Sequence, residues 1–329
     1  MPRSALADFL VLFGLALLLW CLVPVSPPGW SGIVCEAEEH CLPAAEVFNQ
    51  HTVNFPFLLL WPRSQNYSEE WFSACLPAGK GRSQLIEASL RRFRARAAMG
   101  MEPVIVHIGP STLEREVGLY RKLCGAVRGL CRIFLVEPVM SVHSELQANT
   151  RSIGARNGSI TVVHAAVCLE SASNYSIYTV SDDLVRRIPG ARRAYEWSSA
   201  DQASLVYWAT TSAPFLQEVP SLSAEEWSAH TQRVAVRCVS LPELLGELRL
   251  SPADVDYLVV DAEGHDLGIV EAALAIDALV PVVIQFEFES SSADGVASVV
   301  RALAAQAYDV HKNVRDVFAV YHKVAHPDW

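Results

Sequence analysis

Three acidic residues and a glycine follow an apolar run in the second half of the chain. Residues 255–260 read Val-Asp-Tyr-Leu-Val-Val, and Asp261, Glu263 and Gly264 come directly after them. In open α/β sheets, ligands bind outside the carboxyl ends of the strands. Carboxylates at such a place can act as general bases or hold a bound group. A solvated turn has the same composition, so the interpretation depends on how neighbouring segments end.

Four other short, apolar segments end in polar or turn-forming residues. They are 104–108 before Gly109-Pro110-Ser111, 133–136 before Glu137-Pro138, 160–163 before His164-Ala165-Ala166, and 282–286 before Glu287. Continuous β-branched runs of this kind are typical of parallel strands covered on both faces. Helical patterns lie between or after them, at 114–127, 142–152, 267–274 and 296–307, and 317–321 reads as a last strand. The alternation predicts a doubly wound α/β domain with a mostly parallel sheet of about seven strands and flanking helices.

An apolar segment near the N-terminus predicts a signal-anchor or a signal peptide over residues 1–25. Residues 9–25 carry no charge, and a stretch of roughly 17–25 apolar residues can cross a bilayer. Arg3 precedes this segment and Glu36 follows it, so the positive-inside rule places the rest of the chain in the lumen. We therefore expect a single-pass protein of the Golgi or endoplasmic reticulum membrane, with its C-terminal domain lumenal, or a secreted protein. A buried core helix is the alternative.

Sequons and cysteines agree with a lumenal location. Asn66, Asn157 and Asn174 each begin an Asn-x-Ser sequon, which predicts a glycoprotein. An oxidising compartment allows disulfides. The candidates are Cys35, Cys41 and Cys75 in the N-terminal region, and Cys124 with Cys131. Because the sequence has no Cys-x-x-Cys pair or His/Cys cluster, we expect no structural zinc site.

Composition divides the rest of the chain into a stem and cap over 26–100 and an α/β domain over 101–329, with an irregular insertion at about 179–229. Insertions of this length are usually functional lids or disordered. Within it, Trp197, Tyr207 and Trp208 are candidates to stack on a sugar, although aromatic residues are more often part of a core. The net charge of −10 argues against a nucleic-acid partner.

Two basic clusters are present in the sequence. The cluster at 91–96 is expected to be a solvated helix face, and the one at 186–193 a mobile loop.

The segment from Asp256 to Leu267 resembles the hallmark of the FkbM family of S-adenosylmethionine-dependent methyltransferases, Asp-x-x-Lys-x-Asp-x-Glu-Gly-x-Glu. Glu137-Pro138 with the later Leu146 and Asn149 is similar to the Glu-Pro element of that family. Residues 234–241, before Leu244-Leu245, resemble the strand that precedes the hallmark. The resemblance spans about two thirds of the chain. It implies a Rossmann-like class I methyltransferase fold, S-adenosyl-L-methionine as cofactor, and methyl transfer to a hydroxyl of a small molecule or, as we expect, a glycan.

The cofactor loop departs from the family pattern. Where the family has Asp-x-Gly-Ala-Asn-x-Gly, this chain has His107-Ile108-Gly109-Pro110-Ser111, and the ungapped register places Leu113, whose side chain would crowd the cofactor, at the last glycine. An alternative alignment recovers a glycine at Gly118 by inserting residues. His107 either bonds the cofactor carboxylate or amine in a different pattern or marks a site that no longer binds cofactor. The hallmark lysine is also replaced, by Val259.

The strand ends and the resemblance together give the candidate site residues. The candidates for cofactor binding are His107, Gly109, Pro110, Ser111, Glu137, Pro138, Ala165 and Asp261. Among them, Glu137 is expected to accept hydrogen bonds from the ribose hydroxyls. The candidate bases for the acceptor hydroxyl are Asp261, Glu263, His265 and Glu287, and a metal is not expected.

Two other functions remain open at this point. The first is a degenerate methyltransferase fold that binds a partner or a glycan without catalysis. The second is a lumenal glycosyltransferase in which Asp261-Ala262-Glu263 would hold Mn²⁺ against a nucleotide diphosphate.

Overall fold

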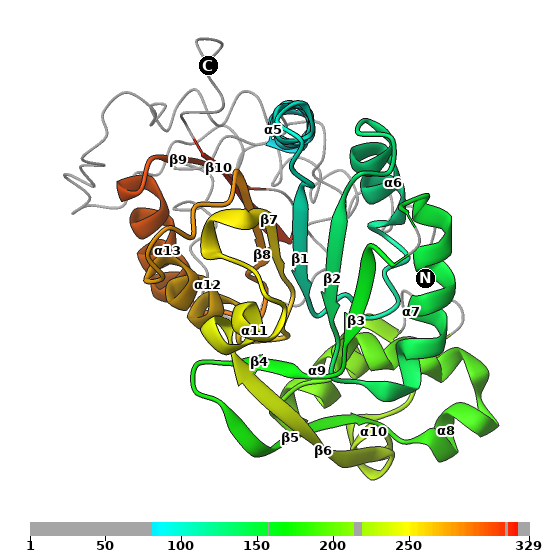
Figure 1. Ribbon diagram of the computed structural model, residues 1–329. Coiled ribbons are helices and arrows are strands. Elements are labelled where there is room, and N and C mark those ends of the chain that lie inside the picture. The colour runs from blue at the N-terminus through cyan, green and yellow to red at the C-terminus, as the bar shows by residue number, and fades with distance from the viewer. Residues whose placement is uncertain (1–80, 157, 214–218, 313–314, 322–329) are drawn as a thin grey trace, which may run out of the picture. The chain divides into compact units, whose positions relative to one another are not determined.

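A computed structural model describes residues 81–156, 158–213, 219–312 and 315–321 (Figure 1). The main sheet consists of β1 (Val104–Ile108), β2 (Arg132–Val136), β3 (Ile160–Val163), β7 (Val255–Val260), β8 (Val283–Glu287), β9 (Tyr308–Lys312) and β10 (Asp316–Tyr321). The strand order is β3-β2-β1-β7-β8-β10-β9. All neighbours are parallel except β10, which runs antiparallel to β8 and to β9. The predicted α/β fold with a mostly parallel seven-stranded sheet is confirmed.

Helices cover both faces of this sheet (Figure 1). One face carries α5 (Gly81–Ala98), α6 (Val117–Gly125) and α7 (His143–Thr150), and the other carries α11 (Leu241–Glu247), α12 (Asp266–Leu274) and α13 (Ala293–Ala305). Alternate residues of β1 enter different cores, since Ile105 belongs to the same cluster as Leu123 and Val106 to the same cluster as Ile269. Burial on both faces explains why the strands read as unbroken apolar runs.

A second sheet of three strands accompanies the first. It contains β4 (Ala166–Cys168), β5 (Ala172–Val180) and β6 (Thr231–Ser240), in the order β4-β6-β5. Strand β6 includes the segment that the family resemblance placed before the hallmark, and it belongs to this sheet and not to the main one. The helices α8 (Asp182–Arg187), η3 (Pro189–Trp197), α9 (Gln202–Ser212) and α10 (Ala224–Ala229) pack here around the fully buried Trp227.

The segment from 179 to 229 therefore differs from the irregular insertion that the sequence suggested. Its described part is largely helical and contributes to a hydrophobic core of its own. The arginines at 186–193, expected in a mobile loop, lie in α8 and η3 and are held in ion pairs: Arg187 with Asp183 at 2.9 Å, and Arg192 with Glu145 of α7. Periodicity missed these helices because they are short and carry aromatic and small residues on several sides.

Two disulfides lie within the described residues. Cys124 and Cys131, the pair expected from the sequence, are bonded with their Cα atoms 5.5 Å apart. A second bond, between Cys168 of β4 and Cys238 of β6, was not expected and joins two strands of the second sheet with a Cα separation of 5.9 Å.

Several predictions fall outside the described residues. They concern the apolar segment 9–25, the stem up to residue 80, the sequon asparagines Asn66 and Asn157, and the cysteines Cys21, Cys35, Cys41 and Cys75. No helix in the part of the chain that the structure describes is long and apolar enough to cross a bilayer.

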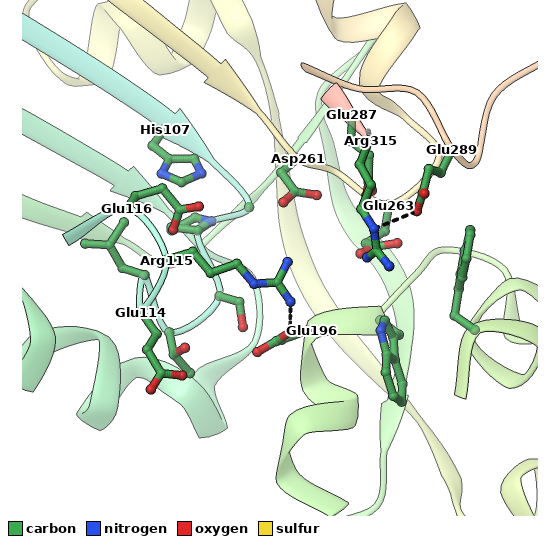
Figure 2. Close-up of a pocket in the computed structure, with 17 residues that line it drawn as sticks. His107, Glu114, Arg115, Glu116, Glu196, Asp261, Glu263, Glu287, Glu289 and Arg315 are labelled. Atoms are coloured by element: carbon green, nitrogen blue, oxygen red, sulfur yellow. Dashed lines mark hydrogen bonds and ion pairs between the residues drawn. The ribbon is translucent and has the colours of Figure 1, made fainter. Parts of the chain in front are cut away.

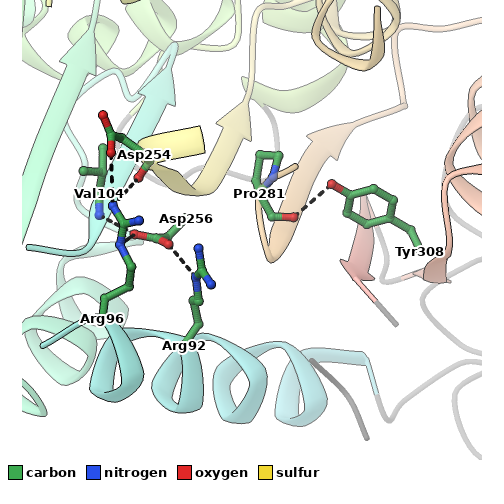
Figure 3. A network of polar contacts seen from close by, with 7 residues as sticks. All are labelled: Arg92, Arg96, Val104, Asp254, Asp256, Pro281 and Tyr308. Carbon is green, nitrogen blue, oxygen red and sulfur yellow. Dashed lines mark hydrogen bonds and ion pairs between the residues drawn. The ribbon is translucent and has the colours of Figure 1, made fainter. Parts of the chain in front are cut away.

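Helix α5 is tied to the sheet by charges at the amino end of β7 (Figure 3). Arg92 Nε donates to Asp256 Oδ1 at 2.7 Å, the Val104 amide donates to Asp256 Oδ2 at 2.9 Å, and Arg96 Nε lies 3.3 Å from the same Oδ2. Asp256 has no exposed surface. Two arginines of the cluster that we expected on a solvated face are therefore engaged with the sheet. Burial of one carboxylate is compensated here by two cations and a backbone donor.

Candidate functional site

A pocket opens at the carboxyl ends of β1, β7 and β8 (Figure 2). The loop after β1, residues 109–116, forms one wall, and acidic residues from the ends of β7 and β8 form another. Trp197 at the end of η3 and Trp208 of α9 also line it, so the helices that pack on the second sheet contribute to the same site. Its empty space is about 690 Å³ when the open mouth is included.

The structure brings together seven of the predicted site residues. His107, Gly109, Pro110, Ser111, Asp261, Glu263 and Glu287 all line this pocket. Four others do not line it, namely Glu137, Pro138, Ala165 and His265. The central strands of the sheet thus supply the lining residues, and the next strands outward, β2 and β3, do not.

The loops after β1 and β7 meet at their backbones. The Gly109 amide donates to the carbonyl of Val136, and the Asp261 amide donates to the carbonyl of Ile108, each at 2.9 Å. Gly109 has φ of +74°, and a Cβ added to it would overlap the carbonyl oxygen of Asp261. A glycine is therefore required at this position by the protein's own packing, whether or not a ligand is bound.

Three carboxyl groups gather on the side of the pocket formed by β7 and β8 (Figure 2). Asp261, Glu263 and Glu287 each offer an oxygen, and these oxygens lie within 4.8 Å of one another. Burial, reinforced by the charge of Glu287, raises the pKa of Asp261 and of Glu263 well above their usual values. Burial, followed by the charges of Asp266 and Glu289, raises the pKa of Glu287 to about 8. Such a group either retains a proton at neutral pH or needs a cation among its oxygens.

Arginines and tryptophans complete the walls. Arg115 pairs with Glu196 of η3 at 3.2 Å and so connects the loop after β1 to the helices of the second sheet (Figure 2). Arg315 pairs with Glu289 at 3.4 Å. The Trp208 indole donates to Ser290 Oγ at 3.2 Å, which fixes its ring at the pocket. Of the three aromatic residues proposed to stack on a sugar, Trp197 and Trp208 are pocket residues.

Tyr207 is placed differently from these two tryptophans. It does not line the pocket, and its ring packs against that of Trp208 with the centroids 5.2 Å apart.

Glu137 lies behind the loop and not in the pocket. Its Oε2 accepts from the Ser111 amide at 2.9 Å and its Oε1 from the Val139 amide at 2.7 Å. The residue is 4% exposed, and burial raises the pKa of its carboxyl to about 7. Its observed role is to hold the backbone of the loop at Ser111. Contact with the ribose remains a prediction, and each oxygen still has capacity for a second donor.

The other residues that fall outside the pocket have structural partners. His265 is exposed, and its Nε2 lies 2.5 Å from the hydroxyl of Tyr175. Ala165 is fully buried in the core beneath α11. The carbonyl of Pro138 lies 2.9 Å from Nε2 of His164. None of these positions favours a direct part in chemistry at the pocket.

Residues 116–318 match the family of the methyltransferase FkbM domain, which accounts for more than half of the chain. The protein belongs to the FkbM methyltransferase-domain family. A crystal structure of the methyltransferase FkbM from Methylobacillus flagellatus KT is similar at 14% identity and a TM-score of 0.38, over 67% of this chain and 44% of that one. The precorrin-6y C5,15-methyltransferase from Geobacter metallireducens GS-15 is similar at 12% identity and a TM-score of 0.32, over 71% and 85%.

The match covers less than half of the length of the Methylobacillus chain. No curated protein sequence matches this chain at a significant level.

The loop after β1 retains a backbone suited to the FkbM motif although its residues differ. Gly109, Ser111 and Leu113 have φ of +74°, +45° and +62°. In the ungapped register these are the positions at which the family has Gly, Asn and Gly, the residues that tolerate left-handed backbone best. Gly118, the glycine of the alternative alignment, lies within α6 and does not have left-handed backbone.

Leu113, which we expected to crowd the cofactor, borders the pocket, but most of its side chain is directed into the core. Its side chain is 1% exposed and packs in the core with Leu123. The left-handed backbone at this position turns the side chain into the core, so the loop can keep its course without a glycine there.

The acids of the FkbM hallmark divide into two roles. Asp256 anchors α5, roughly 15 Å from the pocket at about 3.3 Å per strand residue. Asp266 is 1% exposed, and its carboxylate accepts from the amides of Ala262 at 2.7 Å and Gly264 at 3.0 Å. It thereby fixes the turn that directs Asp261 and Glu263 into the pocket. Two acids of the hallmark, Asp256 and Asp266, are thus structural, and two, Asp261 and Glu263, line the pocket.

Several pocket residues were not predicted from the sequence. They are Arg115, Glu116, Glu196, Glu289 and Arg315. Glu116 is the most perturbed of them, since burial raises its pKa to about 7. Glu289 could have been predicted, because it lies two residues beyond Glu287, the last residue of β8. Glu196 could not, because it lies in the 179–229 segment, whose sequence shows no hydrophobic periodicity.

Proposed function

We propose that this protein is an S-adenosylmethionine-dependent methyltransferase that acts on a hydroxyl group. The observation that carries the proposal is the pocket at the ends of β1, β7 and β8, bounded by a loop whose backbone is left-handed at the Gly, Asn and Gly positions of the FkbM motif. This left-handed loop backbone is the feature that we expect to accommodate the amino-acid end of the cofactor. Pocket acids complement a cationic ligand, because each carboxylate can stabilise positive charge at short range.

The cofactor, when bound, supplies an electrophilic methyl group on a sulfonium. The loop of His107, Gly109 and Ser111 would hold its amino-acid end, and Glu137 would approach its ribose from behind the loop. Transfer requires the acceptor oxygen in line with the methyl group at about 3–3.5 Å. The proton of the acceptor hydroxyl needs a base within hydrogen-bond reach. Glu287, with a pKa raised to about 8, would be a strong base in its ionised form, which the positive charge of a bound sulfonium favours, and Asp261 and Glu263 are further candidates.

A sugar ring is the acceptor that the pocket walls support. Trp197 and Trp208 line the same pocket as the carboxyl cluster. Aromatic rings offer a flat apolar surface to the C–H face of a sugar, while carboxylates accept from its hydroxyls. We therefore propose a glycan, or a small molecule that carries a sugar, as the methyl acceptor.

The secretory pathway is the compartment that we propose. Disulfides form and persist in oxidising environments, and two lie within the described residues. The sequon residue Asn174 is exposed on β5, where a glycan can be attached. With the apolar segment 9–25, these features support a membrane-anchored protein with a lumenal domain, or a secreted protein.

The deciding experiment is calorimetry with the full chain produced in a secretory host. We expect binding of S-adenosylmethionine, with loss of affinity in Asp261→Asn and little change in His265→Gln, the control outside the pocket. Absence of binding at millimolar cofactor would favour the alternative of a glycan-binding protein without catalysis. Transfer of a labelled methyl group to a panel of glycans then tests the acceptor class.

One observation favours a second candidate. The oxygens of Asp261, Glu263 and Glu287 are close enough to hold a divalent cation, as a metal-dependent glycosyltransferase would require. Family membership supports the methyltransferase first. Turnover of a nucleotide sugar that depends on Mn²⁺, without any response to S-adenosylmethionine, would reverse this order.

A further inference from the structure

His107 occupies an unusual position for a histidine. It lies in β1 among strand residues that are all buried, is 2% exposed, and still borders the pocket. Its Nδ1 lies 2.9 Å from the hydroxyl of Tyr120 in α6, and the two rings meet edge to face with centroids 6.0 Å apart. A buried, hydrogen-bonded imidazole next to an open pocket is held in one orientation and presents its other nitrogen to whatever binds there.

The partner residue determines which nitrogen carries the proton. Tyr120 is fully buried, and the described residues offer its hydroxyl one acceptor, Nδ1 of His107. A buried O–H group without an acceptor is strongly disfavoured. The hydroxyl therefore donates and Nδ1 accepts, so the single proton of the neutral ring is on Nε2. Burial also lowers the pKa of His107 to about 3, so the ring remains neutral at physiological pH.

Nε2–H is then a donor without an acceptor in the described part of the chain. The contact with Tyr120 occupies Nδ1, and the ring itself lines the pocket (Figure 2). Around it, the pocket offers the carboxyl groups of Asp261 and Glu116. A ligand with one anionic and one cationic group could bind here through both. Its anionic group would accept a hydrogen bond from His107, and its cationic group would pair with the carboxylates.

We propose that His107 donates a hydrogen bond from Nε2–H to the carboxylate at the amino-acid end of the ligand. This inference rests on the proposed use of S-adenosylmethionine. The FkbM motif has an acid at this position, and an ionised acid can only accept hydrogen bonds. The substitution by histidine therefore replaces a hydrogen-bond acceptor with a donor at the end of β1. The ligand's ammonium group would then pair with Asp261.

The test compares two ligands, S-adenosylmethionine and its analogue that lacks the carboxylate, by calorimetry on the wild-type protein and on His107→Ala. The variant should lose roughly 10- to 100-fold in affinity for S-adenosylmethionine and less than about threefold for the decarboxylated analogue. Equal losses for both ligands would overturn the inference while leaving the proposed function intact. Wild-type protein that binds neither ligand would overturn both.

A second measurement does not depend on how His107→Ala folds. Nitrogen NMR of ring-labelled histidine in the wild-type protein distinguishes the two neutral tautomers, and we expect the Nε2–H form for His107. Tyr120→Phe removes the donor to Nδ1 and so no longer fixes the tautomer of His107. The ratio of affinities for S-adenosylmethionine and its decarboxylated analogue should therefore fall several-fold, although His107 is still present. Observation of the Nδ1–H tautomer in the wild-type protein would rule the inference out.

Discussion

Gly109 and Asp261 touch backbone to backbone, and a single added carbon on Gly109 would overlap the carbonyl oxygen of Asp261. This contact joins the loop after β1 to the FkbM hallmark, two segments more than 150 residues apart in the sequence. The two walls of the pocket are therefore set relative to each other by a glycine.

Gly109→Ala should destabilise the protein strongly, by roughly 3 kcal/mol or more, because overlap with backbone is added to a left-handed φ. Chemical denaturation measures the effect. Gly118→Ala is the matched control, since a Cβ on Gly118 in α6 meets nothing within 4 Å. That change should stabilise by about 0.5–1 kcal/mol. A Gly109→Ala protein with wild-type stability would show that the two loops do not meet as described.

Asp256→Ala should cost about 3–5 kcal/mol, because it leaves the Val104 amide without its acceptor and the buried Arg96 with Asp254 alone. Thermal and urea unfolding would report the loss. Glu87→Ala serves as the control, since it removes an exposed ion pair to Arg91 within α5 and should cost less than about 0.5 kcal/mol. If the two variants were equally stable, Asp256 would not be the anchor of α5.

Stability should fall as the pH rises from about 5 to 8. The pKa of Glu137 and that of Glu116 are both raised to about 7 by burial, so the folded state binds protons that the unfolded chain releases nearer pH 4.5. The stability from these protons is complete below that pH and is lost as the pH passes 7. We expect a loss on the order of 1–3 kcal/mol, or several degrees in melting temperature.

The variant Glu116→Gln should flatten this profile. Glu114→Gln, two residues earlier and exposed, should leave its slope unchanged. A profile that rises between pH 5 and 8 would contradict the burial of these acids.

Loss of the Cys168–Cys238 disulfide should cost about 4 kcal/mol, the chain-entropy value for a loop of this length, given the sequence separation of 70 residues. The double variant Cys168→Ala/Cys238→Ala tests it by denaturation. The comparison variant Cys124→Ala/Cys131→Ala opens a loop with a separation of only 7 residues and should lose about 2–3 kcal/mol through loop entropy. Peptide mapping without reductant provides the connectivity, and any other pairing of Cys168 would refute the arrangement of β4 and β6.

The main sheet was predictable because its strands are apolar on both faces. The expected strand 255–260 matches β7, and 160–163 matches β3, residue for residue. The helix expected from 114 begins instead at Val117. The loop before it contains residues with left-handed backbone, which cannot be recognised from hydrophobic periodicity. Strand β9 was missed, since Tyr308–Lys312 lies at the edge of the sheet and mixes polar with apolar residues.

The site was predictable in position and less so in detail. Strand ends indicated Asp261, Glu263 and Glu287, and the structure places all three in one pocket. Glu137 has the expected position at the end of β2, but its side chain turns to the Ser111 and Val139 amides. His265 faces solvent, whereas Asp266, the next residue, is buried. The direction of a side chain in a turn depends on local hydrogen bonds, which spacing alone does not encode.

Glu196 and Trp197 reach the pocket from a layer that has its own hydrophobic core and its own disulfide. Changes in this layer can alter one wall of the pocket while the strands beneath the loop after β1 stay as they are. Under the proposed function, preference for the acceptor can diversify separately from the chemistry, and exchange of residues 189–212 between related proteins is the expected route to a new acceptor.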